Sequence, residues 1–172
     1  DYLLEACNQC KILIRNQSGV QVTFGISDIN RNLLEVPGMF QAARYAVKSK
    51  FYSTGDRILL ASEVKRLDES CDFRFVELKE EIELIFDQGG DDAYKALLDR
   101  FFPANTHYSE AFIRSLCYSI INFIQLLLSE RNESLEAIFG SEVKIWEKPA
   151  KLETLSEIKN WLTDIFRLIM EH

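Results

Sequence analysis

The sequence contains no long apolar run that is free of charged residues. The nearest approach, residues 115–129, is shorter than the ~18 to 20 residues that a membrane span needs, and it still contains polar side chains such as Asn122. The first residues, up to Arg15, lack the basic start and the small-residue cleavage site of a signal peptide. We therefore expect a cytoplasmic protein without a membrane segment. The sequence does not begin with Met, so we also expect a fragment or a processed product.

Clusters of basic residues and a cysteine framework are also absent. The 20 Lys and Arg residues are scattered among 27 Asp and Glu residues, which gives a net charge of −7 and argues against direct binding of nucleic acid by this segment. The sequence is 47% hydrophobic, enough to form a core without disulfide bonds. We expect free thiols in a reducing compartment for the four cysteines, Cys7, Cys10, Cys71 and Cys117.

The first sixty residues alternate between helical and extended patterns. Apolar residues recur at helical spacing in Tyr2–Arg15, and Val20–Ile26 then alternates apolar and polar side chains as a strand with one buried face does. A second helical pattern covers Val36–Tyr52. The short apolar run in Arg57–Ala61 is typical of a strand, and we expect it to pair with Val20–Ile26 after the helix has crossed back.

From residue 65 onward almost only the helical period is present, interrupted by Gly89-Gly90, Pro103 and Pro149. Short loops between consecutive helices favour antiparallel neighbours in a bundle. The expected fold class is therefore α+β, with a small α-β-α-β unit in residues 1–64 and an all-α helical bundle in residues 65–172. The predicted helices of the bundle are Val76–Gln88, Asp91–Phe101, Tyr108–Glu130, Ser134–Phe139 and Leu155–Glu171.

Residues 22–27 (VTFGIS) and 40–52 (FQAARYAVKSKFY), followed by Gly55 and Ile58, resemble the end of the degenerate GGDEF-like domain of bacterial regulators. In that family a strand of the form VTIGIS precedes a helix of the form YQEALEALKYRFYLG and a final strand. The small residues Ala43 and Ala46 lie three apart and would let the helix sit close to the sheet, while Phe51 would fill its edge.

The helical remainder resembles the linker of large AraC-type response regulators, which consist of a receiver domain, a GGDEF-like and helical middle, and two helix-turn-helix motifs. The similar phrases are residues 78–98, the leucines at 126–128 and the closing TLSEIKNWLTDIFRLI at 154–169. The resemblance implies that residues 1–64 are the C-terminal part of a GGDEF-like domain, and that residues 65–172 precede a DNA-binding domain absent from this chain.

Two departures from that family matter. Only one helix precedes the strand that begins at Val20, where the family has further strands and helices, so we expect a truncated or reduced GGDEF-like unit with an incomplete sheet. The Gly-Gly-(Asp/Glu)-Glu-Phe hairpin, which binds nucleotide and metal in active cyclases, has no counterpart before Val20. We therefore expect neither a cofactor nor cyclase activity.

Residues 89–92, Gly-Gly-Asp-Asp, look like part of that hairpin and could in principle hold magnesium. They fall between two helical patterns, where Gly supplies a left-handed C-cap and Asp an N-cap. The interpretation as a helix junction is the better one, because cap residues at such a junction need no further cause.

The spacing of Cys7 and Cys10 allows zinc binding or redox cycling, but the two further zinc ligands are lacking. On a helix these cysteines would share an apolar face, so we expect them in the core. His107 and His172 are isolated in the sequence and are predicted to lie at the surface. The acidic residues between Glu77 and Glu83 are predicted to form the solvated face of an amphipathic helix, although a glycosidase-like pair of carboxylates is the alternative.

Aromatic residues occur at helical intervals through the bundle, which favours core packing over a ligand cage. They are Phe101, Phe102, Tyr108, Phe112, Tyr118, Phe123, Trp146, Trp161 and Phe166. The last predicted helix has a wide apolar stripe that could pair with a second subunit or pass motion to the DNA-binding domain, or could simply pack on its own bundle. This candidate interaction face comprises Leu155, Ile158, Leu162, Ile165, Phe166 and Ile169, with Trp161 beside it.

The sequence thus predicts a protein that is not an enzyme, with no catalytic or metal-binding residues. By resemblance, it is a signal-transmission segment of a bacterial two-component response regulator that controls transcription and links a receiver domain to an AraC-type helix-turn-helix domain. It could form a homodimer, and DNA would be bound through the absent domain. The alternative is a sensing domain that holds a small molecule or a cyclic dinucleotide between the strand Val20–Ile26 and the bundle.

Overall fold

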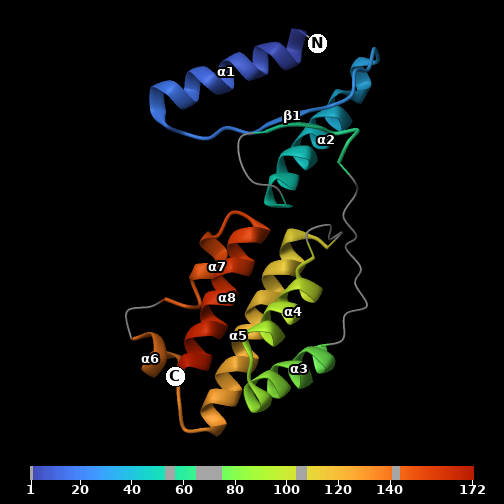
Figure 1. The fold of residues 1–172 in the computed structure, drawn as a ribbon. Coiled ribbons are helices and arrows are strands. Elements are labelled where there is room, and N and C mark those ends of the chain that lie inside the picture. The colour runs from blue at the N-terminus through green and yellow to red at the C-terminus, as the bar shows by residue number, and fades with distance from the viewer. Residues whose placement is uncertain (1, 53–56, 65–74, 104–107, 141–143) are drawn as a thin grey trace. The chain divides into compact units, whose positions relative to one another are not determined.

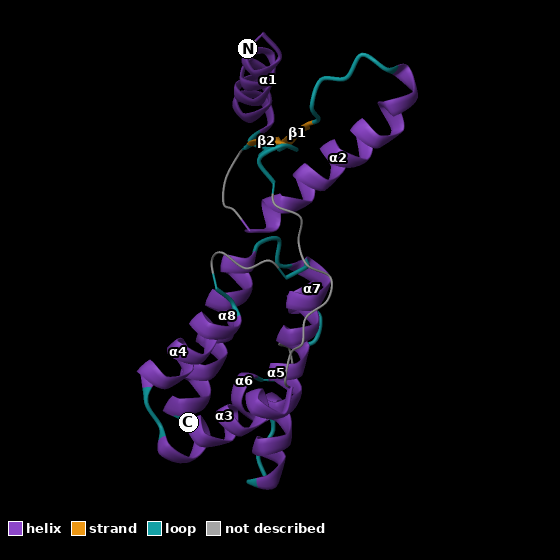
Figure 2. Cartoon of the chain, turned by 90° about the vertical axis from the view of Figure 1, so that its right-hand side faces the viewer, coloured by secondary structure: helices purple, strands orange, loops and turns teal. Residues whose placement is uncertain are grey.

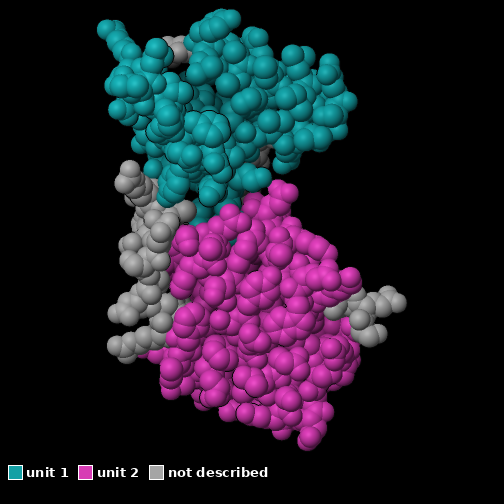
Figure 3. All heavy atoms as spheres, turned by 180° about the vertical axis from the view of Figure 1, so that it is seen from behind, with its two compact units in different colours: residues 1–66 teal, residues 67–172 magenta. Residues whose placement is uncertain are grey.

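The computed structural model describes residues 2–52, 57–64, 75–103, 108–140 and 144–172. These residues are mostly helical, with a small two-stranded parallel sheet. Two compact units make up the chain, residues 1–66 (unit 1) and residues 67–172 (unit 2), which are coloured separately in Figure 3. The fold is thus a small α+β unit and a set of helices, and each unit is described by itself.

The described residues of unit 1 form two α-helices and a short parallel sheet. Helix α1 covers Tyr2–Ser18, strand β1 Phe24–Ile26, helix α2 Val36–Lys48 and strand β2 Ile58–Leu60. The pairing predicted between the two extended segments is present, with Phe24 opposite Ile58 and Ile26 opposite Leu60 (Figure 2). Short 3-10 turns, Leu33–Glu35 and Ser49–Tyr52, flank α2.

Both strands are shorter than predicted. We expected a strand over Val20–Ile26, but only Phe24–Ile26 joins the ladder, and Val20 is exposed. The alternation of apolar and polar side chains shows which face of a strand could be buried. The length of a strand depends instead on how many residues of the neighbouring strand are available for hydrogen bonding. Here the neighbour, β2, is three residues long. The second helix also ends earlier than predicted, at Lys48, because the chain tightens into a 3-10 turn.

Helix α2 packs closely on the sheet, as the small residues predicted. Ala46 is fully buried, and Phe51 is buried just beyond the helix. Where α2 passes β1 the strand has Gly25, and a Cβ atom added there would overlap the Ala43 carbonyl oxygen and lie 2.7 Å from Val47 Cγ2. The glycine of the VTFGIS segment therefore sets the distance between helix and strand.

Unit 2 consists of helices arranged around α5 (Figure 1). Helices α3, α7 and α8 all pack on α5, and α4 packs on α3 and α8. The elements are α3 (Phe75–Gln88), α4 (Asp91–Phe101), α5 (Glu110–Glu130), α6 (Leu135–Phe139), α7 (Lys148–Lys151) and α8 (Leu155–Glu171). Every helix predicted in this region is present, and α7 was not predicted.

The Gly-Gly-Asp-Asp segment is a junction between α3 and α4. Gly89 has a φ of 66° and donates its N–H to the Ile85 carbonyl, so it ends α3 in the left-handed conformation as predicted. The predicted N-cap is wrong in detail, because Gly90 holds the cap position without a side-chain bond and α4 begins at Asp91. The φ of Gly90 is 133°, a backbone conformation that most other residues cannot adopt, so glycine is suited to this cap position.

The core of unit 2 contains only part of the predicted aromatic set. Phe101, Phe102 and Phe166 are buried, and the ring of Phe166 stacks on Tyr94 with centroids 5.6 Å apart. Trp146 is exposed, so its predicted place in the core is wrong. The other predicted aromatics are half-buried: Tyr108, Phe112, Tyr118, Phe123 and Trp161. Periodicity identifies the side of a helix that is apolar, but it does not show whether a neighbouring helix covers all of that side.

Among the described residues, α5 is the one helix long and apolar enough to cross a membrane by length and composition. Its buried residues, from Ile113 to Leu128, instead contact other helices of unit 2, and 44% of its most apolar window is buried inside the structure. The central helix of a soluble bundle has these same properties. The structure is therefore consistent with a soluble protein.

Candidate functional site

Among the described residues, no group of three or more His, Cys, Asp or Glu side chains could hold a metal ion. Asp92 is exposed on the first turn of α4, and the side chain of Asp91 lies outside the described structure. His172 is exposed, as predicted, whereas His107 lies outside the described residues. Three other features are candidates for a functional role. They are the apolar face of α8, the connection between α7 and α8, and the cysteines.

The six residues predicted as an interaction face on α8 all lie in the core of unit 2. They are Leu155, Ile158, Leu162, Ile165, Phe166 and Ile169, and each is buried. Helix α8 packs on α4 and α5, which cover this face. The stripe is therefore not available to a second subunit while the bundle is folded, and packing on its own bundle is what the structure shows.

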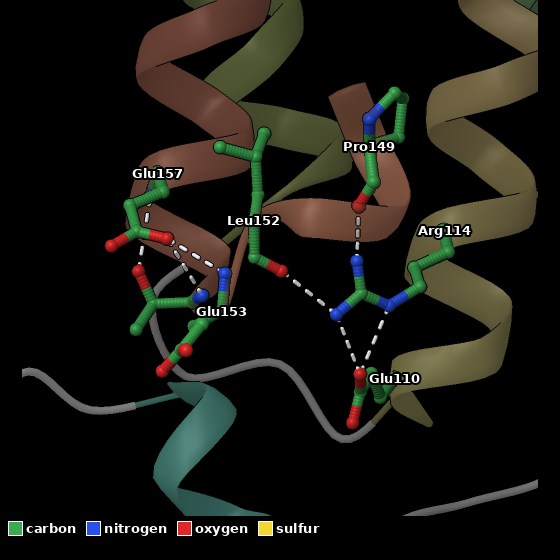
Figure 4. Close-up of polar contacts among 7 residues, drawn as sticks. Glu110, Arg114, Pro149, Leu152, Glu153 and Glu157 are labelled. Atoms are coloured by element: carbon green, nitrogen blue, oxygen red, sulfur yellow. Dashed lines mark hydrogen bonds and ion pairs between the residues drawn. The ribbon is translucent and has the colours of Figure 1, made fainter. Parts of the chain in front are cut away.

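The connection between α7 and α8 is held by a side chain from α5 (Figure 4). Arg114 donates to the backbone carbonyl of Leu152 at 2.9 Å and to that of Pro149. The same guanidinium binds Glu110, one turn earlier on α5, at 2.7 and 2.9 Å. Its side chain is 21% exposed, so these charge-assisted bonds are partly shielded from water. We call Arg114 and Glu110 the arginine clamp.

The N-terminus of α8, at the end of the same connection, is held by its own side chains. Thr154 accepts the N–H of Glu157 at 3.2 Å, and Glu157 Oε2 accepts the N–H groups of Thr154 and Glu153 at 3.3 and 2.7 Å. This is a capping box, in which two helix-end donors are satisfied reciprocally. Together with the arginine clamp it binds the connection to α5 at one end and to α8 at the other.

The arginine clamp was not predicted from the sequence. Two signals were available: Glu110 and Arg114 stand at i and i+4, and Arg114 is the one Lys or Arg residue in a largely apolar helix. A charge within such a helix usually has a defined partner. The partners themselves, two carbonyl groups 35 and 38 residues away, cannot be read from spacing.

The acidic face of α3 is solvated only in part. Glu77 and Glu80 are exposed as predicted, but Glu81 binds Arg100 of α4 at 2.6 Å. Leu84, on the same helix, is also exposed. At the end of α3, Arg131 donates to Asp87 at 3.0 Å. These carboxylates join helices at the surface, where an ion pair contributes about 0–1 kcal/mol.

The cysteines divide into a buried and an accessible set. Cys117 is fully buried in α5, and desolvation of its thiolate raises the pKa to about 12, against a smaller lowering by Arg114. Cys7 is half-buried and Cys10 is exposed, so the prediction that both lie in a core is wrong. Helix α1, which contacts β2, has no buried residue. Cys71 lies outside the described residues.

Comparison of the chain with protein-family models, with curated proteins and with solved structures finds no match. The resemblance to GGDEF-like and AraC-type regulators therefore stays a prediction. What is known of the chain therefore comes from its own structure. Unit 1 has a strand-helix-strand arrangement. Unit 2 is a helical bundle whose last helix is attached by buried apolar contacts and by the arginine clamp.

Proposed function

We propose that the chain is a non-catalytic signal-transmission segment of a bacterial transcription regulator, working in the cytoplasm. In this proposal it links a phosphorylation-controlled receiver domain to an AraC-type helix-turn-helix domain, which alone contacts DNA. The strand-helix-strand arrangement of unit 1 supports it, because the similar segment of the GGDEF-like family has the same order. The order of these elements in unit 1 is β1, α2 and β2.

The observation that carries the proposal is the attachment of α8. Its apolar face is buried against α4 and α5, and its N-terminus is held by the capping box next to the arginine clamp. A helix held along its length and at one end moves together with its bundle. Any domain joined rigidly to α8 would therefore follow a displacement of the bundle, which is what a transmission element requires.

The proposal can be tested by breaking α8 in the intact regulator. Asn160 is exposed in the middle of α8, and Asn160→Pro removes a backbone donor and distorts the helix, at a cost of about 3 kcal/mol or more. The matched control is Asn160→Ala, which keeps the helix. We expect the ratio of DNA affinities with and without receiver phosphorylation to fall toward one in the proline variant only. An unchanged ratio in that variant would refute the transmission role.

Sedimentation equilibrium over a concentration series tests whether this segment also sets the geometry of a dimer. Because the apolar face of α8 is already buried, a dimer would have to use other residues. A dimer would make the segment a determinant of half-site spacing on DNA, whereas a monomer at every concentration would leave dimerisation to the other domains.

The sensing alternative makes a different prediction. A small molecule or cyclic dinucleotide that binds the folded state, present at 100 times its dissociation constant, should stabilise the fold by about 2.7 kcal/mol. A thermal-shift series with cyclic dinucleotides therefore separates the two functions. Transmission without a ligand predicts an unchanged melting temperature at every concentration.

A further inference from the structure

Helix α1 carries two accessible thiols on neighbouring turns. Cys7 and Cys10 are three residues apart, which puts them on one side of the helix with Cα atoms about 5 Å from each other. Cys10 is exposed and Cys7 is half-buried. The sequence favoured a core position for both, and the structure removes that explanation for their spacing. Two thiols with this geometry can act as one bidentate ligand.

The distance between the two side chains favours a bridging atom over a direct disulfide. Cβ atoms three residues apart on a helix are about 5–6 Å from each other, whereas a disulfide needs about 3.5–4.5 Å. A direct bond would therefore distort α1. Two sulfur atoms bonded at about 2.3 Å to one central atom lie roughly 3.5–4 Å apart, a separation that the two side chains can reach from an undistorted helix.

We propose that Cys7 and Cys10 form a two-thiol binding site for soft, thiophilic ligands of the class of trivalent arsenicals. A structural zinc ion takes four ligands, and the described residues contain no group of three His, Cys, Asp or Glu that could hold one. A trivalent arsenic atom with one organic substituent needs only two sulfur ligands. The proposal does not rest on the proposed function, but it would give a transmission segment a chemical input in unit 1.

The binding step is balanced without an oxidant or a reductant. When an organic arsenoxide binds, two As–S bonds form, and the two S–H bonds and the bonds between arsenic and oxygen break. The two thiol protons leave with the oxygen atom as water. Arsenic stays trivalent throughout, and both sulfur atoms end as thiolate ligands.

Phenylarsine oxide is the probe for the first experiment. The full chain carries Cys71→Ser, so that Cys117 is the one cysteine left besides Cys7 and Cys10. Cys117 is buried and its pKa is raised to about 12, so it should not react in the folded chain. We expect one equivalent of arsenical to remain bound in excess monothiol and to be released by a dithiol. Replacing either cysteine, Cys7→Ser or Cys10→Ser, should weaken retention by about 10²–10⁴-fold, because the second bond is no longer intramolecular.

Moving one thiol along the helix gives matched controls with the same number of cysteines. Combining Cys10→Ser with Gln9→Cys places the thiols two residues apart on different sides of α1, and retention should be lost. Combining Cys10→Ser with Lys11→Cys places them four residues apart on one side, and retention should persist. Release of the arsenical from the parent by monothiol, or equal retention by the variant with thiols two residues apart, would overturn the proposal.

Discussion

In the described residues, unit 2 buries most of its large apolar side chains, whereas unit 1 leaves nearly all of its own exposed or half-buried. In the described part of unit 1, Ala46 and Phe51 are the buried apolar residues, and the remaining buried apolar residues of the chain belong to unit 2. Unit 1 instead exposes side chains such as Leu13, Leu34 and Phe40. The difference follows from architecture: several helices around α5 enclose a core, but a two-stranded sheet with one closely packed helix is too small to do so.

The comparison teaches that similar apolar composition does not give similar burial. In unit 2 the hydrophobic effect acts over a large enclosed surface. In unit 1 the structure depends on close approaches such as that of α2 to Gly25 of β1. Substitutions should therefore act through lost burial in unit 2 and through steric fit in unit 1, and the predictions that follow are ordered by expected size.

The largest effect is expected from truncating the fully buried ring in α8. Phe166→Ala removes the partner of Tyr94 and opens a cavity among α4, α5 and α8, which should lower the free energy of unfolding by about 3–5 kcal/mol. The same change in unit 1, Phe40→Ala, removes a side chain that is 60% exposed and should cost less than about 1 kcal/mol. Urea denaturation of both variants measures the contrast. Equal losses would contradict the division between the units.

In unit 1 the sensitive position is a glycine. Gly25→Ala would place a Cβ against the Ala43 carbonyl, so α2 must move away from β1, at about 1–3 kcal/mol. The control is Gly38→Ala within α2, where the nearest atom is 3.8 Å away and the greater helix propensity of alanine should stabilise by about 0.5–1 kcal/mol. Hydrogen exchange of the β1 amides reports both changes. Similar exchange in the two variants would show that helix-to-strand distance is not limiting.

Removing the arginine clamp should weaken unit 2 without opening its core. Arg114→Met keeps a long apolar stem but leaves the carbonyls of Pro149 and Leu152 without this donor, at an expected cost of about 1–3 kcal/mol. Arg167→Met removes an exposed pair with Asp164 on α8 and should cost less than about 0.5 kcal/mol. Thermal denaturation followed by circular dichroism compares the two variants. A cost for Arg167→Met as large as that for Arg114→Met would mean that the clamp has no special role.

The smallest of these effects concerns the capping box. Thr154→Ala removes the side chain that accepts the Glu157 N–H and should cost about 0.5–2 kcal/mol. Thr163→Ala, in the middle of the same helix, removes a hydroxyl that bonds back to the Lys159 carbonyl and should change stability little. Chemical denaturation separates a capping effect from a general effect of losing threonine. If both substitutions cost the same, the box contributes nothing measurable.

Sequence alone was sufficient where local signals agree. Helices α4 and α8 begin and end at the predicted residues. A glycine junction precedes α4, and α8 starts at a capping box formed by Thr154 and Glu157. Helix α7 was missed because it is four residues long and Pro149 was taken as an interruption. Proline is in fact well suited to the first turn of a helix, where its missing N–H is not needed.

What the sequence could not give was the partner of each apolar face. The periodicity of α1 and that of α8 are both helical, yet α8 is covered by neighbours and α1 is not. For this reason Cys7 and Cys10 were assigned to a core that unit 1 does not have. Periodicity records where a helix could be buried, and only the tertiary arrangement decides whether it is.

The arginine clamp also affects how freely the chain can vary. Arg114 binds carbonyl groups, and Glu157 binds N–H groups, so the connection between α7 and α8 is recognised through atoms that nearly every residue possesses. Exposed side chains beside it, such as that of Lys151 at the end of α7, can change during evolution without altering its path. Selection on the shape of this connection would thus fall on positions outside it.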